Sequence, residues 1–491
     1  MLKVQYVSMQ KFQASNIIIF GGDGDLAYRK IYPALFEIWK SGLLKDKMLI
    51  YPVVRKTAKK QFLDRLSDAL QTHLKHENDQ DSNNIKSFFE IVEYVKISLP
   101  NEQEYKVLKS LLDGSKGFQN IYYFSTPSKA FGEISHLLKK MNLIDSSSKV
   151  VLEKPIGNKL SSFEKINNQI ASAFAENQIY RIDHYLGKET VQNLMVLRFS
   201  NHLFEKSWNR DHIENIQITV AESIGVETRG NFYNETGALL DMVQNHLLQI
   251  LCLVAMDPPH ALNAESVRNE KLKVLKALRK FDENTPHNQS VKGQYTRGQI
   301  NNVEVGSYLE DIELYHSSIE TFVALRVYID NWRWKNVPFY LRTGKRLAKR
   351  YSEIVINFKP VCHNIFNSAQ TLENNKLIIR LQPEERIELV QLTKIPGPGG
   401  YRYKPISLKL DFIDSFEKRL PNAYERLIFD IIRGNQTLFM SDKELIASWS
   451  WIDGLISHWQ QSSKQNELYK SGSWGPSHKV LLQDDHWFIN E

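Results

Sequence analysis

The stretch Asn16-Ile17-Ile18-Ile19-Phe20-Gly21-Gly22-Asp23-Gly24-Asp25-Leu26-Ala27 decides the fold of the first part of the chain. Its β-branched run is short and ends at glycine, which is typical of a buried parallel strand. A helical pattern through Leu35 and Trp39 follows. This order predicts a dinucleotide-binding turn, because glycines let the backbone approach a pyrophosphate at a helix N-terminus. The spacing is G-x-x-G-x-x-A rather than G-x-G-x-x-G, so an ordinary tight turn stays an alternative.

Strands and helices keep alternating after this turn. Five more strands are expected, at residues 48–54, 94–97, 121–124, 149–152 and 179–182. Six strands alternating with helices predict a doubly wound, Rossmann-like parallel sheet, whose ligands bind at the carboxyl ends of the strands. Lys154 and Asp183 both lie at such ends.

The second strand is followed by Arg55 and Lys56. An NAD-binding chain carries an acidic residue there for the ribose hydroxyls, whereas a basic residue accommodates the 2′-phosphate of NADP. The pair therefore favours NADP, with NAD as a weaker alternative coenzyme. A solvated run of charges that continues to Lys60 would explain the same residues without a ligand.

A second informative stretch is Arg181-Ile182-Asp183-His184-Tyr185-Leu186-Gly187-Lys188-Glu189. Gly187 is expected to let the backbone turn, and a helix is expected to begin after it. Free N–H groups and the positive dipole end of a helix favour an anion, so a phosphate is the expected ligand. A polar connection with its charges in water is the alternative.

The pattern changes from about residue 212. Strands are expected in series at 216–222, 321–329, 354–358 and 377–382, which predicts a mainly antiparallel sheet. One apolar helix, 237–256, contains Asp241, Asn245 and His246, and a basic turn, 342–346, follows a strand at 339–341. The expected fold class is α/β plus α+β, with domains at 1–185 and 186–491.

Composition narrows the class of protein. The 491 residues carry 63 Lys and Arg against 56 Asp and Glu, a net charge of only +7 spread along the chain, which suits anionic small molecules as well as nucleic acid. The sequence has no basic tail and no aromatic-basic platform, so nucleic acid is not expected as a partner. Cys252 and Cys362 cannot form a disulfide framework or a zinc cage, which predicts a reduced, cytoplasmic protein without a metal. The apolar run at 17–20 is too short for a signal or a membrane span.

Five motifs together resemble the glucose-6-phosphate 1-dehydrogenase family: Gly24-Asp25-Leu26-Ala27, Glu153-Lys154-Pro155, the stretch 181–189, Met242-Val243-Gln244-Asn245-His246, and Arg342-Thr343-Gly344-Lys345. The resemblance runs from about Ile17 to Trp487. It implies NADP-linked oxidation of the C1 hydroxyl of glucose 6-phosphate to 6-phosphogluconolactone, the first step of the oxidative pentose phosphate pathway. It also implies a homodimer through the large sheet, with a tetramer as the alternative.

The resemblance also implies a role for individual residues. His246 matches the general base, and Asp183 the carboxylate that holds its imidazole. The expected substrate-binding residues are His184, Tyr185 and Lys188 for the phosphate, and Lys154, Glu222, Asp241, Lys345 and Arg350 for the sugar. The expected coenzyme-binding residues are Gly21, Gly24, Asp25, Leu26, Arg55, Lys56 and Lys154.

Some of these roles have alternatives. His246 shares a helix face with Met242 and Ile250, so the residues alone also fit a core histidine. On an α-helical wheel Asp241 lies roughly 140° from His246, so the two could share a ligand only if it sat across the helix. Asp23 stands where relatives often carry a small or hydroxylated residue, and its carboxylate would repel a pyrophosphate unless it pointed away. Arg350 replaces a lysine of many relatives, which changes the donor geometry.

Two other functions fit parts of the pattern. A different sugar or inositol dehydrogenase could share the glycine turn and the Glu-Lys-Pro motif, and it would accept a sugar without phosphate. A non-catalytic dinucleotide-binding regulator could keep the fold. The joint retention of Asp183, His246, Lys154 and Lys188 argues against the regulator, because a sensor does not need a base.

Overall fold

The computed structural model describes residues 13–44, 47–74, 79–98, 101–366, 372–398, 400–411, 419 and 421–489. The chain forms two compact units. Unit 1 comprises Met1–Gly187, Ala261–Glu265 and Pro421–Asp442, and unit 2 comprises Lys188–His260, Ser266–Leu420 and Lys443–Glu491. The expected division at 185/186 did not include the late segment 421–442, which returns to unit 1.

Unit 1 is built on a six-stranded parallel sheet with the order β3-β2-β1-β4-β5-β6. Its strands are β1 (Ser15–Phe20), β2 (Met48–Val54), β3 (Val95–Lys96), β4 (Gln119–Phe124), β5 (Lys149–Leu152) and β6 (Ile179–Arg181). The predicted doubly wound sheet is confirmed. The strand order reverses between β1 and β4, which is where ligands bind in sheets of this kind.

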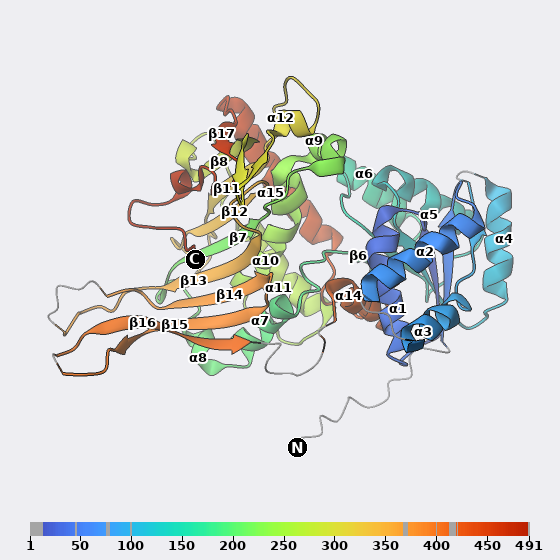
Figure 1. The fold of residues 1–491 in the computed structure, drawn as a ribbon, viewed down its shortest axis with the longest axis horizontal. Helices are drawn as coiled ribbons and strands as arrows, with labels where there is room; N and C mark the ends of the chain where they lie inside the picture. The colour runs from blue at the N-terminus through green and yellow to red at the C-terminus, as the bar shows by residue number, and fades with distance from the viewer. Residues whose placement is uncertain are drawn as a thin grey trace, which may run out of the picture. The chain divides into compact units, whose positions relative to one another are not determined.

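Helices of unit 1 surround this sheet (Figure 1). They include η1 (Ala27–Ile31), α1 (Tyr32–Lys40), α2 (Lys59–Leu74), α3 (Asp79–Phe89), α4 (Glu102–Asp113), α5 (Phe131–Lys140), α6 (Leu160–Ala171) and α14 (Ala423–Arg433). Helix α14 shows why its segment folds as it does. Asn422 and Glu425 form a capping box at its start, and Gly434, with φ of 76°, ends it in the left-handed region that favours glycine.

Unit 2 contains a nine-stranded sheet with the order β16-β15-β14-β13-β7-β12-β11-β8-β17. Its strands are β7 (Ile213–Ala221), β8 (Ser290–Thr296), β11 (Phe322–Val327), β12 (Phe339–Gly344), β13 (Tyr351–Phe358), β14 (Lys376–Gln382), β15 (Arg386–Lys394), β16 (Tyr403–Asp411) and β17 (Glu467–Lys470). Six of its eight pairings are antiparallel, so the predicted mainly antiparallel sheet is confirmed. The exceptions, β12–β7 and β17–β8, are parallel. The long strands β13 to β16 lie side by side in Figure 1.

The apolar helix expected at 237–256 is buried in unit 2. It consists of a π-helix, η5 (Leu239–Leu247), followed directly by α10 (Leu248–Ala255). By length and composition the segment Tyr233–Ala255 could cross a membrane, with a mean hydropathy of 1.5. However, 89% of its apolar window is buried inside the protein, which is typical of a core helix.

Arg342 was expected in a turn, and this expectation is wrong. Strand β12 stays paired with β7 as far as Gly344, so Arg342 lies within the sheet and is fully buried. Its guanidinium lies 5.0 Å from the ring centre of Trp474 and 4.2 Å from that of Trp487, and it donates a hydrogen bond to the Tyr351 hydroxyl at 3.0 Å. Aromatic faces and a hydroxyl compensate the buried charge.

A buried ion pair joins two helices of unit 2, α11 (Ala264–Ala277) and α15 (Asp442–Gln461). Lys271 Nζ lies 2.7 Å from Glu444 Oε1, both side chains are almost fully buried, and Gln249 Oε1 accepts a second hydrogen bond from Lys271 at 3.0 Å. A lysine charge that loses its partner in such a site is costly.

We expect Glu444→Gln to lower the free energy of unfolding by about 3–5 kcal/mol, because Lys271 keeps its buried charge without a counter-ion. The measurement is urea-induced unfolding followed by tryptophan fluorescence. Glu270→Gln is the control, since Glu270 pairs at 2.7 Å with Lys273, whose side chain is 68% exposed. That pair is worth less than about 1 kcal/mol. Equal losses in the two variants would contradict the prediction.

Candidate active site

The glycine turn of unit 1 lies at the point where the strand order reverses. The N–H groups of Gly21 and Gly22 donate to Val53 O at 3.1 and 3.0 Å, so the turn is attached to the end of β2. Gly21 has φ of 76°, and a Cβ there would lie 2.5 Å from Ser125 O. Only glycine fits this close approach of the turn to the residues after β4. The turn lies at the edge of the sheet where a pyrophosphate would bind. Helix η1 begins at Ala27, directly after Leu26.

Two carboxylates of the turn are directed differently. Asp25 is exposed and pairs with Arg29 at 3.1 Å. Asp23 Oδ2 accepts a hydrogen bond from Thr57 Oγ1 at 2.5 Å, so the Asp23 side chain extends toward the segment after β2. The exposed Arg55 and Lys56 begin that segment. The Asp23 side chain therefore points toward the end of β2, where sheets of this kind bind the ribose of a dinucleotide.

The ends of β5 and β6 lie next to each other, because Leu152 pairs in parallel with Arg181. Glu153 follows β5 and accepts a hydrogen bond from the Tyr123 hydroxyl at 2.5 Å. Burial raises the pKa of Glu153 to about 7, although hydrogen bonds from Tyr123 and Tyr424 and the charge of Lys154 oppose the shift. Glu153 belongs to the Glu153-Lys154-Pro155 motif, but only Lys154 was expected to have a role, because nothing in the sequence brings Tyr424 to this place.

The segment after β6 carries Asp183, which is 1% exposed. Its Oδ1 accepts the Tyr185 N–H at 2.8 Å, and its backbone oxygen accepts the Leu186 N–H at 3.1 Å. These bonds fix the carboxylate in a tight turn. The rings of His184 and Tyr185 follow, with their centres 4.9 Å apart.

The role expected for Gly187 needs a correction. Gly187 does not adopt a positive φ, so the turn does not require glycine for its backbone angles. A Cβ at this position would lie 2.7 Å from Ala423 O and 3.0 Å from Leu427 Cγ. Glycine is needed because helix α14 packs directly against the backbone here.

Helix α7 (Glu189–Phe199) begins unit 2, with Lys188 as its N-cap residue. The Thr190 N–H in its first turn donates to Glu385 Oε2 at 2.8 Å. Lys188 Nζ donates a longer bond, 3.4 Å, to Leu381 O. A carboxylate of the protein thus already caps one of the helix N–H groups that were expected to bind an anion. Recognition of a phosphate at this helix end would depend on the side chains.

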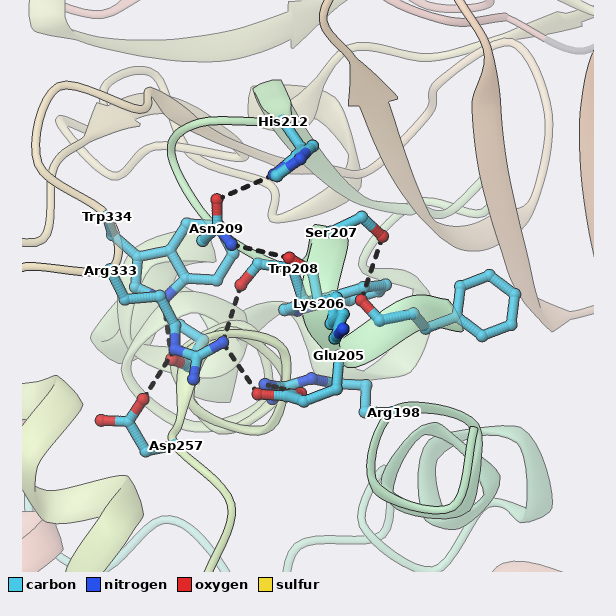
Figure 2. Close-up of polar contacts among 12 residues, drawn as sticks. Arg198, Glu205, Lys206, Ser207, Trp208, Asn209, His212, Asp257, Arg333 and Trp334 are labelled. Carbon is cyan, nitrogen blue, oxygen red and sulfur yellow. Dashed lines mark hydrogen bonds and ion pairs between the residues drawn. The ribbon is translucent and has the colours of Figure 1, made fainter. Parts of the chain in front are cut away.

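The other end of α7 is anchored by a network shown in Figure 2. Arg198 is fully buried, donates to Leu253 O at 2.9 Å, and pairs with Glu205 at 3.3 Å. Glu205 also pairs with Arg333 at 2.9 Å, and Arg333 with Asp257 at 2.6 Å. Burial lowers the pKa of Arg198 to about 9. These bonds, with the Glu385 cap, hold the helix that carries Lys188 at both of its ends.

The helix that carries His246 is a π-helix, which corrects the wheel argument for Asp241. The N–H of Leu248 reaches Val243 O, and the Asn245 side chain reaches Leu240 O, both five residues back. In a π-helix residues i and i+5 come together, so Asp241 and His246 share a face. The separation of roughly 140° expected from the sequence holds only for an α-helix. Short π segments occur frequently at functional sites.

Glu320 holds the start of this π-helix. Its Oε1 accepts the Leu239 N–H at 3.0 Å, and its backbone oxygen accepts the Ala238 N–H at 2.9 Å. Gly237, with φ of 63°, provides the space for the Glu320 carboxylate, because a Cβ there would lie 2.4 Å from Glu320 Oε1. Burial raises the pKa of Glu320. No periodicity in the sequence indicated this role.

Parallel pairing of β7 with β12 brings two predicted sugar-binding residues together. Glu222 and Lys345 follow the two strand ends, and Lys345 Nζ lies 2.7 Å from Glu222 Oε2. Lys345 Nζ also lies 5.1 Å from the ring centre of Tyr233. Burial raises the pKa of Tyr233, and the charges of Asp241 and Glu222 contribute. Tyr233 was missed, because its spacing in the sequence carries no signal.

Arg350 is the predicted sugar-binding residue that this group does not include. It is exposed and directly precedes β13. The described contacts of unit 2 gather Glu222, Asp241, Lys345 and Tyr233 without it.

The glycine turn at the reversal of a parallel sheet, together with this polar group beside a histidine-bearing helix, defines a dinucleotide-dependent oxidoreductase acting on a polar substrate. Comparisons with known proteins specify it further. The profile of "Glucose-6-phosphate dehydrogenase, NAD binding domain" matches residues 18–193, and that of "Glucose-6-phosphate dehydrogenase, C-terminal domain" matches residues 195–488. The chain belongs to the glucose-6-phosphate dehydrogenase family.

Individual relatives agree with this assignment. The chain is 44% identical to the glucose-6-phosphate 1-dehydrogenase of Rhizobium meliloti over 95% of both chains, and 44% identical to that of Mycolicibacterium smegmatis with the same coverage. It is similar to a solved glucose-6-phosphate dehydrogenase in complex with its substrate glucose-6-phosphate, with a TM-score of 0.88, 32% identity, and coverage of 99% of this chain and 100% of that one. A structure from Mycobacterium avium gives a TM-score of 0.82 at 30% identity, covering 97% and 99%.

The protein is therefore an NADP-dependent oxidoreductase that oxidises glucose 6-phosphate, the entry reaction of the oxidative pentose phosphate pathway. The glycine turn at the carboxyl end of β1, where the strand order reverses, fits the pyrophosphate of such a coenzyme. The predicted family, fold class, activity and coenzyme are confirmed.

Glu153 gives a pH-dependent prediction for stability. Its folded pKa is about 7 and its ordinary value is 4.5, so between these pH values the folded protein keeps a proton that the unfolded chain loses. Stability then falls as the pH rises. Glu153→Gln cannot ionise, so its free energy of unfolding should rise by about 1–3 kcal/mol relative to wild type between pH 4.5 and pH 7.5. This range is smaller than the full pKa shift would give, because Glu153 is partly exposed. Urea unfolding at several pH values measures it, and a difference independent of pH would contradict it.

Proposed function

We propose that His246 is the general base of this reaction and accepts the proton of the C1 hydroxyl. NADP, when bound, accepts the hydride from C1. An imidazole has an unperturbed pKa near 6.5, so its neutral form is available near neutral pH. Asp183, by its match to the family, orients the imidazole and stabilises it once it is protonated. Two features support these roles: the π-helical geometry around His246 and the fixed, buried carboxylate of Asp183.

The polar group of unit 2 is the observation that carries the proposal for the sugar. Glu222, Asp241 and Lys345 gather around Tyr233 and offer both acceptors and donors to sugar hydroxyls. Asp241 shares a helix face with His246, so a sugar bound by this group would present a hydroxyl to the imidazole. We keep Arg350 as a substrate-binding residue on the strength of the family alone.

The phosphate of the substrate would be bound by His184, Tyr185 and Lys188. One N–H of helix α7 is already capped by Glu385, so the ammonium of Lys188 supplies the main charge. The coenzyme would be bound by Gly21, Gly24, Asp25, Leu26, Arg55 and Lys56, with Lys154 near the nicotinamide and C1. The position of the glycine turn at the reversal of the strand order supports this placement.

We also propose a homodimer that forms through the nine-stranded sheet, with a tetramer as a larger alternative. Strand β16 is an edge of that sheet, and it exposes Ile406, Leu408 and Leu410, which alternate and so share one face. An apolar edge strand left in water would promote uncontrolled pairing, which a specific partner surface prevents.

A cytoplasmic location is proposed because Cys252 and Cys362 are free thiols.

The role of His246 can be tested with His246→Asn. The expected result is a fall in kcat of about 10²–10⁴ with little change in KM for glucose 6-phosphate, because the variant removes a positioned general base. The loss from Asp183→Asn should not add fully to it, because the two act as a unit. His458→Asn is the control, since His458 is another buried histidine of unit 2. A His246 variant with the wild-type kcat would reassign His246 to the core.

Lys188→Ala tests the phosphate site. We expect kcat/KM for glucose 6-phosphate to fall by about 10- to 150-fold, the worth of a charged hydrogen bond of roughly 1.5–3 kcal/mol. The slow reaction with free glucose should barely change, because glucose has no phosphate to lose. Lys206→Ala, at an exposed lysine of helix α8 (His202–Ser207), serves as the control. Equal losses on both sugars would place Lys188 at C1, and no loss would return it to a solvated helix end.

The dimer surface is tested with Leu408→Glu. A carboxylate in the middle of the apolar stripe of β16 should shift the protein toward monomers by at least about tenfold in the dissociation constant, because a charge would be buried without a partner. Sedimentation velocity over a range of concentrations measures this. Lys404→Glu introduces the same charge at an exposed end of the strand and is the control. An unchanged dissociation constant for Leu408→Glu would exclude this stripe from the interface.

A further inference from the structure

Asp23 occupies a place in the coenzyme site that the family pattern does not explain. It belongs to the glycine turn after β1, yet its Oδ2 is held by Thr57 Oγ1 at 2.5 Å in the segment after β2. Thr57 is itself fixed, because its backbone oxygen accepts a hydrogen bond from the Tyr94 hydroxyl. Burial raises the pKa of Tyr94, and the negative charge of Asp23 raises it further, so the charge acts across this region.

The end of β2 is where doubly wound sheets distinguish NAD from NADP. An acidic side chain there accepts hydrogen bonds from the ribose hydroxyls of NAD, and a basic one pairs with the 2′-phosphate of NADP. In this chain the basic residue, Arg55, comes from the expected strand end, but a carboxylate reaches the same region from the neighbouring turn. The two side chains therefore favour different coenzymes.

We propose that Asp23 is a coenzyme-selectivity residue, which accepts a hydrogen bond from the ribose 2′-hydroxyl of NAD and repels the 2′-phosphate of NADP. It limits the preference for NADP that Arg55 creates, so this NADP-dependent enzyme also binds NAD. Thr57 positions the carboxylate. The inference rests on the coenzyme placement proposed above and does not depend on the sugar or on the general base.

The repulsion has a simple physical origin. A 2′-phosphate carries close to two negative charges at neutral pH, and a nearby half-buried carboxylate raises the free energy of the bound state. A free 2′-hydroxyl gains a charge-assisted hydrogen bond from the same carboxylate. One charge therefore acts in opposite directions on the two coenzymes, a behaviour that general damage to the site cannot reproduce.

The test is isothermal titration calorimetry of the full chain with NAD and with NADP, in the absence of sugar. Asp23→Asn keeps the shape of the side chain and removes its charge. It should tighten NADP by about tenfold and weaken NAD by about tenfold, which changes the ratio of the two dissociation constants by about 100-fold. Asp23→Thr should change the ratio in the same direction, and it keeps the test usable if the asparagine variant folds poorly.

Two variants complete the experiment. Arg55→Ala should change the ratio in the opposite direction, by weakening NADP more than NAD. Asp64→Asn removes one negative charge from the exposed face of helix α2 and should leave the ratio unchanged. The tightening of NADP in Asp23→Asn should shrink at high salt, because screening weakens the repulsion that is removed.

A constant ratio in both Asp23 variants, or an equal weakening of both coenzymes, would overturn the proposal. Binding is measured without substrate, so an error in the roles of His246 or Lys188 would leave these titrations unaffected. If Arg55→Ala left both dissociation constants unchanged, the coenzyme placement itself would be wrong, and that outcome differs from a constant ratio in the Asp23 variants.

Discussion

Parallel strand pairing is the constraint on which both candidate binding regions depend. Two parallel neighbours end at the same edge of a sheet, so whatever follows each strand is brought together there. In unit 1 the ends of β1, β2 and β4 gather the glycine turn, Asp23 and Thr57. In unit 2 the sheet is mainly antiparallel, yet its β7–β12 pair is parallel and brings Glu222 against Lys345.

Buried charges set a second constraint. Arg198, Arg342 and Lys271 are all removed from water, and each has a carboxylate, a hydroxyl, an aromatic face or a carbonyl oxygen as partner. A buried charge that loses its partner destabilises the fold, so these charges favour one arrangement of the surrounding elements over others. The Arg198 network keeps α7 in place, and α7 begins with the lysine proposed to bind phosphate. Packing far from the chemistry can in this way determine where a binding group lies.

Irregular backbone provides a third constraint. The π-helical turn around His246 depends on Gly237, whose missing side chain admits Glu320. It also depends on Glu320, whose carboxylate accepts the Leu239 N–H and whose backbone oxygen accepts the Ala238 N–H. A regular α-helix would place Asp241 and His246 on different faces. The irregular start of the helix and its unusual hydrogen bonds thus serve a local geometry that an unbroken helix could not provide.

The sequence by itself determined the parallel sheet, the glycine turn, the family and most of the candidate residues, because local periodicity and short motifs report which strands are buried and where they end. Only the tertiary structure decided the rest. Tyr424, Glu320 and Glu385 reach their partners from distant parts of the chain, and no local pattern records such a contact. Gly187 and Arg342 show the same limit. Their residue types fit a turn, but the helix packed against Gly187 and the continued strand pairing around Arg342 determine what each residue does.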